Sequence, residues 1–205
     1  MKWKNTHKLL SEDNDTNESR TITIERPTDN QPRDNKIYFY SDINLETILS
    51  LNQQIDEMTK HMKIVQINYD LVEPPPIELH ICTDGGEVYA AMAAVDKILN
   101  NKVSINTYCE GIVASAGTLL SCVGKKRYIT KNSSMLLHQV SGSFWGNFMQ
   151  IVDEHQNFQL IMKMIKKIYI EKSKFKSKEI DELLKHDLCL DAEACLRYGI
   201  VDKII

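Results

Sequence analysis

The chain has 205 residues, a length that fits one domain of ordinary size, with or without a tail. Hydrophobic residues make up 42% and charged residues 26%, a globular balance that excludes collagen-like, mucin-like and wholly disordered chains. The formal net charge of -3 gives no general attraction for phosphate backbones or anionic membrane surfaces. We therefore expect neither a nucleic acid nor a membrane as a partner.

The cysteine content and the apolar runs indicate the cellular localisation of the protein. Five cysteines are present, an odd number without a C-x-x-C pair, which favours reduced thiols in the cytoplasm. No stretch approaches the ~20 apolar residues of a membrane span, and the N-terminal sequence lacks an apolar signal core. We expect a cytoplasmic protein that needs no metal and no other cofactor.

Residues 1–35 are rich in polar and turn-forming residues, and we expect them to form a flexible N-terminal arm. The composition then changes, and KIYFYSDI is dense enough in apolar and aromatic residues for a first strand. The globular domain is therefore expected to span residues 36–205.

Strands and helices are expected to alternate along this domain. A helix through residue 60 follows the first strand, and another strand is expected before the triple proline at 74–76. Next come the strand IELHICT, a turn at Asp84-Gly85-Gly86 and the helix VYAAMAAVDKILNN. The strand VSINTYCEG, the small-residue helix IVASAGTLLSCVG and the strands KRYIT and SMLLH follow. This order predicts a single α/β domain with a largely parallel sheet covered by helices.

An apolar seam marks a long helix expected over 148–169. Its members recur at alternating spacings of three and four residues: Phe148, Ile151, His155, Phe158, Met162, Ile165 and Tyr169. The seam either covers the protein's own sheet or forms an oligomer interface. Two more helices are expected to start near Ser177 and at Asp191, before a last strand in IVDKII.

Ser115 and His138 are the candidate nucleophile and base. Ser115 lies in the small-residue run Gly-Ile-Val-Ala-Ser-Ala-Gly at a strand-to-helix junction, where a substrate backbone has room. His138 ends the apolar run SMLLH, so a buried strand delivers an imidazole to a loop. Alone, such a serine usually serves close packing and such a histidine is usually structural. Together with a diglycine they indicate an activated nucleophile.

The diglycine Gly85-Gly86 follows a strand and precedes a helix, so its backbone N–H groups can face a cleft without side chains in the way. Such donors suit an oxyanion. Phosphate binding is weakly supported, because neither G-x-G-x-x-G nor G-x-x-x-x-G-K-[ST] is present.

Four segments together resemble the family of Clp protease proteolytic subunits: TDGGEVYAAMAAVDKI, CEGIVASAGTLL, SSMLLHQVSGSFWGN and LCLDAEACLRYGIVDKII. The resemblance covers about residues 36–205 and implies a crotonase-like α/β fold with a protruding long helix. It implies a serine endopeptidase that cleaves unfolded polypeptides inside a chamber of stacked homo-oligomeric rings, with an AAA+ unfoldase as partner. Ser115 would be the nucleophile, His138 the general base, and Gly86 and Ala116 the donors of the two oxyanion N–H groups.

The third member of the triad is less directly indicated. Alignment backward from Tyr198-Gly199 places the family's catalytic aspartate near Leu183, where the nearest carboxylates are Asp181, Glu182 and Asp187. We select Asp187, which precedes LCLDA as a family aspartate precedes the matching segment. The alternative is that Asp187 is a surface or helix-end carboxylate.

Further alternatives stay open for the activity and for the N-terminal residues. The chain could be a catalytically weak structural or regulatory subunit of a mixed ring, or a crotonase-type enzyme acting on acyl thioesters. The residues before the first strand could form axial loops that meet the unfoldase, or residues 1 to about 20 could be a processed propeptide.

Overall fold

The computed structural model describes residues 35–205. Its contacts divide the chain into residues 1–33 and 34–205, and the account below concerns the second unit. The expected N-terminal arm lies outside the described residues, apart from its last residue, so the two interpretations of that segment stay predictions.

Within the described residues, seven strands form one sheet: β1 (Lys36–Phe39), β2 (Ile77–Thr83), β3 (Ile105–Ala114), β4 (Arg127–Ile129), β5 (Ser134–Leu136), β6 (Cys189–Asp191) and β7 (Lys203–Ile204). The main path runs β1-β2-β3-β4-β7, and every neighbouring pair along it is parallel. The C-terminal part of β3 also pairs in parallel with β5, and β5 pairs antiparallel with β6. The expectation of a largely parallel sheet is confirmed.

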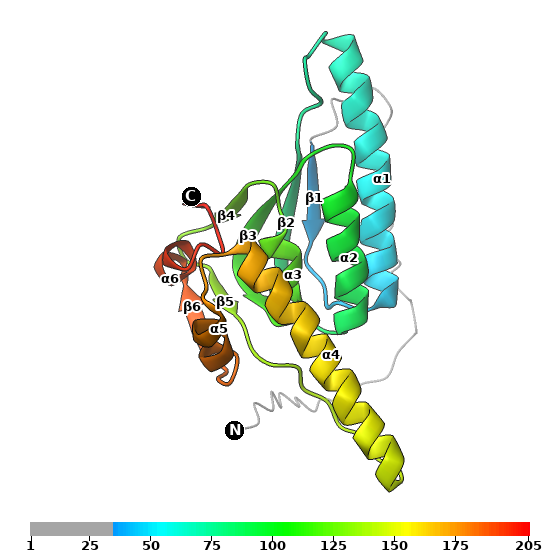
Figure 1. Cartoon of the computed structure of the whole chain (residues 1–205). Helices are drawn as coiled ribbons and strands as arrows, with labels where there is room; N and C mark the ends of the chain where they lie inside the picture. Colours follow the sequence, from blue (N-terminus) through cyan, green and yellow to red (C-terminus); the bar gives the residue numbers. More distant parts are fainter. Residues whose placement is uncertain (1–34) are drawn as a thin grey trace, which may run out of the picture. The chain divides into compact units, whose positions relative to one another are not determined.

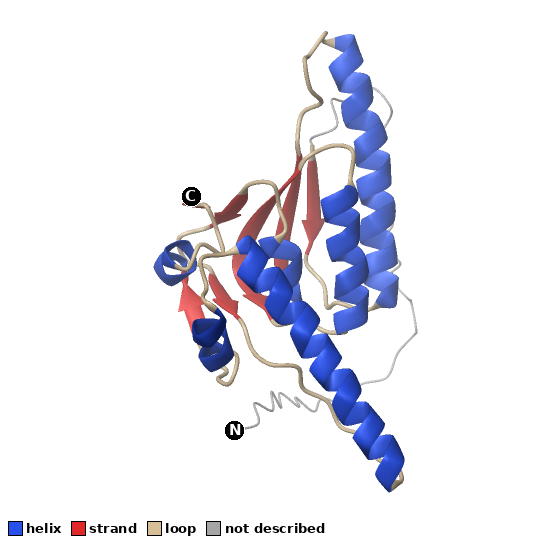
Figure 2. Cartoon of the chain, viewed as in Figure 1, coloured by secondary structure: helices blue, strands red, loops and turns tan. Residues whose placement is uncertain are grey.

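Six helices accompany the sheet in the same part of the chain: α1 (Leu45–Asn68), α2 (Val88–Asn100), α3 (Ala116–Cys122), α4 (Phe148–Lys172), α5 (Ser177–Leu183) and α6 (Ala192–Arg197). Figure 1 shows α1 and α2 side by side against one face of the sheet, with α4 running past α3 and extending beyond the strands. The alternation of strands (red) and helices (blue) is plain in Figure 2. Helices therefore cover one face, and α4 is the protruding helix that the sequence led us to expect.

The two faces of the sheet differ in composition. Leu79 and Ile81 on β2 and Ile129 on β4 are fully buried toward the helices. The opposite face carries a row of stacked rings that follows the strand register: Tyr38, His80, Tyr108 and Tyr128. The period of two expected for β-strands thus separates an apolar inner face from a polar aromatic outer face.

Two sequence-based assignments are wrong. The strand expected between residue 60 and the prolines is absent, because α1 continues to Asn68. Its buried positions keep a helical spacing past residue 60: Ile48, Leu51, Ile55, Thr59 and Met62. The helix expected over IVASAGTLLSCVG begins only at Ala116, because β3 runs through Ala114.

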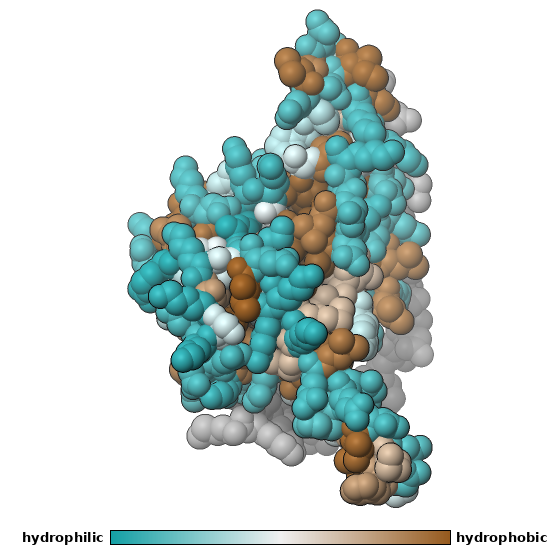
Figure 3. Space-filling view, in the orientation of Figure 1, coloured by the Kyte–Doolittle hydropathy of each residue, from teal (hydrophilic) through white to brown (hydrophobic). Residues whose placement is uncertain are grey.

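The apolar seam of α4 divides into two halves. Ile165 and Tyr169 are buried in the core, and Phe158 and Met162 pack against it. Toward the start of the helix, Phe148 is 77% exposed and Ile151 is 51% exposed. Figure 3 shows brown, hydrophobic atoms gathered at this free end of α4. The C-terminal half of the seam therefore covers the protein's own core, and the N-terminal half is left exposed, where the oligomer-interface interpretation stays a prediction.

Candidate active site

Ser115 occupies a sharp turn between β3 and α3. Its backbone has φ 53° and ψ -126°, a positive φ that costs a non-glycine residue about 1–3 kcal/mol. The Ser115 N–H donates to the Leu136 carbonyl at 2.8 Å, which joins the turn to the end of β5. A Cβ on Gly85 would lie 2.6 Å from the Ser115 Cβ, so the glycine turn packs directly against it. The turn thus presents the serine side chain at the C-terminal edge of the sheet.

His138 follows β5 by two residues and points at this serine. Its Nε2 lies 2.7 Å from the Ser115 Oγ, within hydrogen-bond distance. The neighbouring Gln139 N–H donates to the Leu184 carbonyl at 2.8 Å, which fixes the segment after the histidine to the end of α5. The two residues predicted as nucleophile and base are therefore brought together.

Asp187 approaches the other ring nitrogen. Its Oδ1 lies 3.5 Å from the His138 Nδ1, and its side chain is 81% exposed. The other two carboxylates weighed from the sequence have different partners: Asp181 pairs with Lys166 and Glu182 with Lys185. Of the three, the structure thus places only Asp187 beside the histidine.

The Gly86 and Ala116 N–H groups border the same cleft. In the parallel bridge to Ile43, the Ile43 N–H donates to the Gly85 carbonyl and the Glu87 N–H donates to the Ile43 carbonyl. The Gly86 N–H is consequently directed away from Ile43. Ala116 is the first residue of α3, so its N–H has no acceptor within the helix.

Gly86 cannot carry a side chain in this position. Its φ is +143°, and an added Cβ would lie 2.1 Å from the Ile43 carbonyl oxygen. A glycine here lets the backbone pass close to Ile43 while its N–H remains available on the other side. This is the geometry that backbone donors to an oxyanion require.

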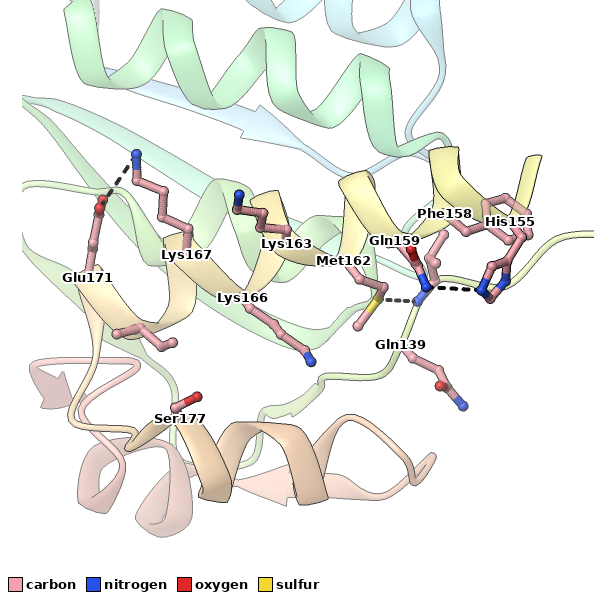
Figure 4. Close-up of a pocket in the computed structure, with 12 residues that line it drawn as sticks. Gln139, His155, Phe158, Gln159, Met162, Lys163, Lys166, Lys167, Glu171 and Ser177 are labelled. Atoms are coloured by element: carbon pink, nitrogen blue, oxygen red, sulfur yellow. Dashed lines mark hydrogen bonds and ion pairs between the residues drawn. The ribbon is translucent and has the colours of Figure 1, made fainter. Parts of the chain in front are cut away.

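The cleft itself has a volume of about 190 Å³. Ser115, His138, Gly86 and Ala116 lie along it, and its apolar wall is formed by Leu119, Ile165 and Tyr169. Val140 and Gln139 also border a larger hollow of about 760 Å³ that runs along α4 toward Ser177. Figure 4 shows this hollow, with lysines of α4 along one side and Met162 beside the 139–140 segment. The segment 139–140 thus borders both the cleft and the hollow.

Comparison with known proteins agrees with this geometry. The sequence profile described as Clp protease matches residues 31–205. This chain belongs to the Clp protease family. Two similar relatives are the ATP-dependent Clp protease proteolytic subunits 2 of Chlamydia trachomatis serovars D and A. Each is 31% identical over 170 residues, which cover 81% of this chain and 84% of the relative.

A solved Clp protease structure shares the fold. A single-site mutant of ClpP1 from Listeria monocytogenes superposes with a TM-score of 0.72, covering 83% of this chain and 91% of that chain. The sequence identity between the two is 23%. The expected crotonase-like α/β fold is therefore confirmed, as is the resemblance to the Clp protease family.

We also searched the described residues for clusters that could bind a metal and for helices that could span a membrane. Between residues 35 and 205, no group of three or more His, Cys, Asp or Glu side chains is arranged to hold a metal ion. In the same range, no helix has both the length and the apolar character that crossing a bilayer demands.

Proposed function

We propose that this Clp protease family member is a serine endopeptidase subunit that hydrolyses peptide bonds of polypeptides. The observation that carries the proposal is the 2.7 Å contact between the His138 Nε2 and the Ser115 Oγ. An imidazole hydrogen-bonded to a serine hydroxyl can remove its proton as the oxygen attacks a carbonyl carbon. The positive φ of Ser115 supports the same role, because strained backbone clusters at functional turns.

The reaction proceeds in two halves. The Ser115 Oγ attacks the peptide carbonyl while His138 takes its proton, and the resulting oxyanion accepts hydrogen bonds from the Gly86 and Ala116 N–H groups. His138 then gives the proton to the leaving amine, and the C–N bond breaks to leave an acyl-enzyme. In the second half, water loses a proton to His138 as its oxygen attacks the ester carbon. The bond between that carbon and the Ser115 Oγ then breaks, His138 returns the proton to Oγ, and the acid leaves.

Asp187 holds the imidazole in the productive orientation. With its Oδ1 3.5 Å from the His138 Nδ1, the carboxylate favours the tautomer with Nδ1 protonated, which leaves Nε2 free to accept. It also stabilises the imidazolium formed during each half-reaction. The exposed carboxylate acts through a partly solvated gap, where charge interactions are screened.

We further propose that copies of this chain assemble into stacked rings around a chamber and degrade unfolded polypeptides delivered by an AAA+ unfoldase in the cytoplasm. Exposed apolar side chains at the start of α4 and in the segment just before it support assembly, since Phe148 is 77% exposed and Trp145 is 95% exposed. The names of the relatives, ATP-dependent proteolytic subunits, support an ATP-driven partner.

The Ser115–His138 contact also bears on the two other functions considered from the sequence, an inactive ring subunit and an enzyme acting on acyl thioesters. An inactive ring subunit and an enzyme acting on acyl thioesters need no serine hydroxyl bound to an imidazole. The contact therefore favours the peptidase over both.

Hydrolysis of a small fluorogenic peptide tests the proposal. Ser115→Ala and His138→Ala should each lower kcat by about 10⁴-fold or more, since the two groups act as one unit. Ser143→Ala, in the exposed segment after the site, is the matched control and should keep the wild-type rate. Near-wild-type turnover by Ser115→Ala would place the chemistry elsewhere.

A further inference from the structure

A buried hydrogen-bond chain links helix α4 to the nucleophile turn. The Thr118 Oγ1 donates to the Ser115 carbonyl oxygen at 2.6 Å, and the Tyr169 hydroxyl lies 2.6 Å from the same Oγ1. Thr118 is fully buried and Tyr169 is 2% exposed. Buried hydroxyl groups need partners, but neither of these takes part in the proposed proton transfers.

The direction of the chain follows from counting protons. A threonine hydroxyl has one proton, and Thr118 uses it on the Ser115 carbonyl. The Tyr169 hydroxyl must therefore donate to the Thr118 Oγ1. Burial raises the pKa of Tyr169 far above its usual value, so the phenol keeps the proton that it donates. The Tyr169 hydroxyl thus donates to the Thr118 hydroxyl, which in turn donates to the Ser115 carbonyl oxygen.

The acceptor at the end of this chain belongs to the same peptide unit as a proposed oxyanion donor. The carbonyl of Ser115 and the N–H of Ala116 share one trans peptide group, in which they point in opposite directions. Anchoring the oxygen in the interior therefore aims the Ala116 N–H at the cleft. The Thr118 N–H contributes a second, longer bond of 3.1 Å to the same oxygen.

We propose that Thr118 and Tyr169 are positioning residues for catalysis, which hold the Ser115–Ala116 peptide so that its N–H meets the oxyanion. The inference rests on the proposed serine mechanism and adds to it two residues that do not touch the reacting atoms. It also makes the position of α4 part of the catalytic geometry, because Tyr169 belongs to that helix.

Kinetics of hydroxyl-deleted variants test the inference. Thr118→Val keeps the shape and removes the hydroxyl, and it should lower kcat about 10- to 100-fold while KM changes less than about twofold. Tyr169→Phe leaves Thr118 in place and should lower kcat by roughly 3- to 10-fold. Thr118→Ser restores the hydroxyl and should return kcat to within about twofold of wild type.

A control on the same helix separates positioning from stability. Ser121 is fully buried in α3 and contacts the Cys109 Sγ at 2.8 Å, away from the nucleophile turn. Ser121→Ala should lower the urea midpoint of unfolding without lowering kcat. The inhibition constant of a peptide boronic acid, whose adduct with serine is tetrahedral, should rise in Thr118→Val and stay unchanged in Ser121→Ala.

The outcomes are distinct. A folded Thr118→Val enzyme with wild-type kcat and wild-type boronic acid affinity overturns the inference. If that variant does not fold, Tyr169→Phe decides in its place, and an unchanged kcat there has the same meaning. Full turnover by Ser115→Ala, in contrast, rejects the serine mechanism itself.

Discussion

The Asp187 Oδ1 lies 3.5 Å from the His138 Nδ1 because the antiparallel pairing of β5 with β6 brings the two residues opposite each other. Leu136 pairs with Cys189, and continuing that register by two residues beyond β5 sets His138 against Asp187. The contact thus lies just beyond the paired ends of β5 and β6, and the carboxylate is 81% exposed. A solvent-facing member of a triad is expected to contribute less than a buried one.

Asp187→Asn should lower kcat by about 10²-fold or more, but by less than the ~10⁴-fold known for a buried orienting aspartate. An amide no longer favours the Nδ1-protonated tautomer and no longer stabilises the imidazolium. Steady-state hydrolysis of a fluorogenic peptide measures the change. Glu182→Gln is the matched control, because Glu182 pairs with Lys185 and should leave kcat unchanged. Equal rates for Asp187→Asn and the wild type would reduce Asp187 to a surface carboxylate.

Charging the exposed end of α4 should dissociate the proposed ring assembly. Phe148→Asp combined with Ile151→Asp places carboxylates on side chains that are 77% and 51% exposed in the single chain, so the fold should survive. In an apolar interface the same charges would be buried without partners, at a cost of several kcal/mol in each subunit. Light scattering should therefore report a smaller particle, with unchanged helical signal in circular dichroism.

The buried half of the seam provides the contrast. Phe158→Asp combined with Ile165→Asp puts a charge into the core, where Ile165 is 6% exposed. This pair should lower helical signal and cause aggregation. A full-sized particle for the Phe148/Ile151 pair would mean that the end of α4 takes no part in assembly.

Gly86→Ala should lose both activity and stability. The new Cβ would lie 2.1 Å from the Ile43 carbonyl oxygen, so the bridge must open and the Gly86 N–H must move. We expect kcat to fall by at least about 10²-fold, as for removal of one oxyanion donor. The free energy of unfolding should fall by roughly 1–3 kcal/mol from backbone strain. Urea titration and peptide turnover on the same sample measure both, and a variant that matches the wild type in both would exclude this geometry.

Asp202 should make stability depend on pH in the acid range. Burial alone would raise the pKa of its carboxyl, but hydrogen bonds from the Arg127 backbone N–H and side chain outweigh burial and lower it. A lowered pKa in the folded state stabilises the fold above the unfolded-state pKa, and this contribution is lost as pH falls below about 4. Asp202→Asn should flatten that part of the stability profile in urea unfolding, whereas Asp153→Asn, at an exposed position on α4, should not. If the free energy of unfolding depended on pH in the same way in the wild type and in Asp202→Asn, a lowered pKa of Asp202 would be contradicted.

Much of the fold could be predicted because its signals are local. The runs of apolar residues identified β2 and β5, and the 3.6-residue spacing identified α4. The end of α1 was missed because HMKIVQIN satisfies a helical and an extended pattern equally well over a short span. The short strand β6, with two of its three residues exposed, had no sequence signal, since its pairing with β5 is a tertiary contact.

The site was predictable to the extent that it depends on strand ends. Ser115 and His138 follow β3 and β5, and paired parallel strands deliver their C-terminal ends to one edge of the sheet. Thr118 and Tyr169 were not predicted for any role at the site. They are 51 positions apart, and a threonine in a short helix and a tyrosine in an apolar seam each look like packing residues.

Covalent labelling with a fluorophosphonate probe tests the central claim most directly. The probe's phosphorus is attacked by an activated serine oxygen with loss of fluoride, and no peptide turnover is needed. Mass spectrometry of proteolytic fragments should find one adduct per chain, on Ser115, with formation at least about 10²-fold slower in His138→Ala. An adduct on another residue, or no adduct on folded wild-type protein, would contradict a serine nucleophile at the end of β3.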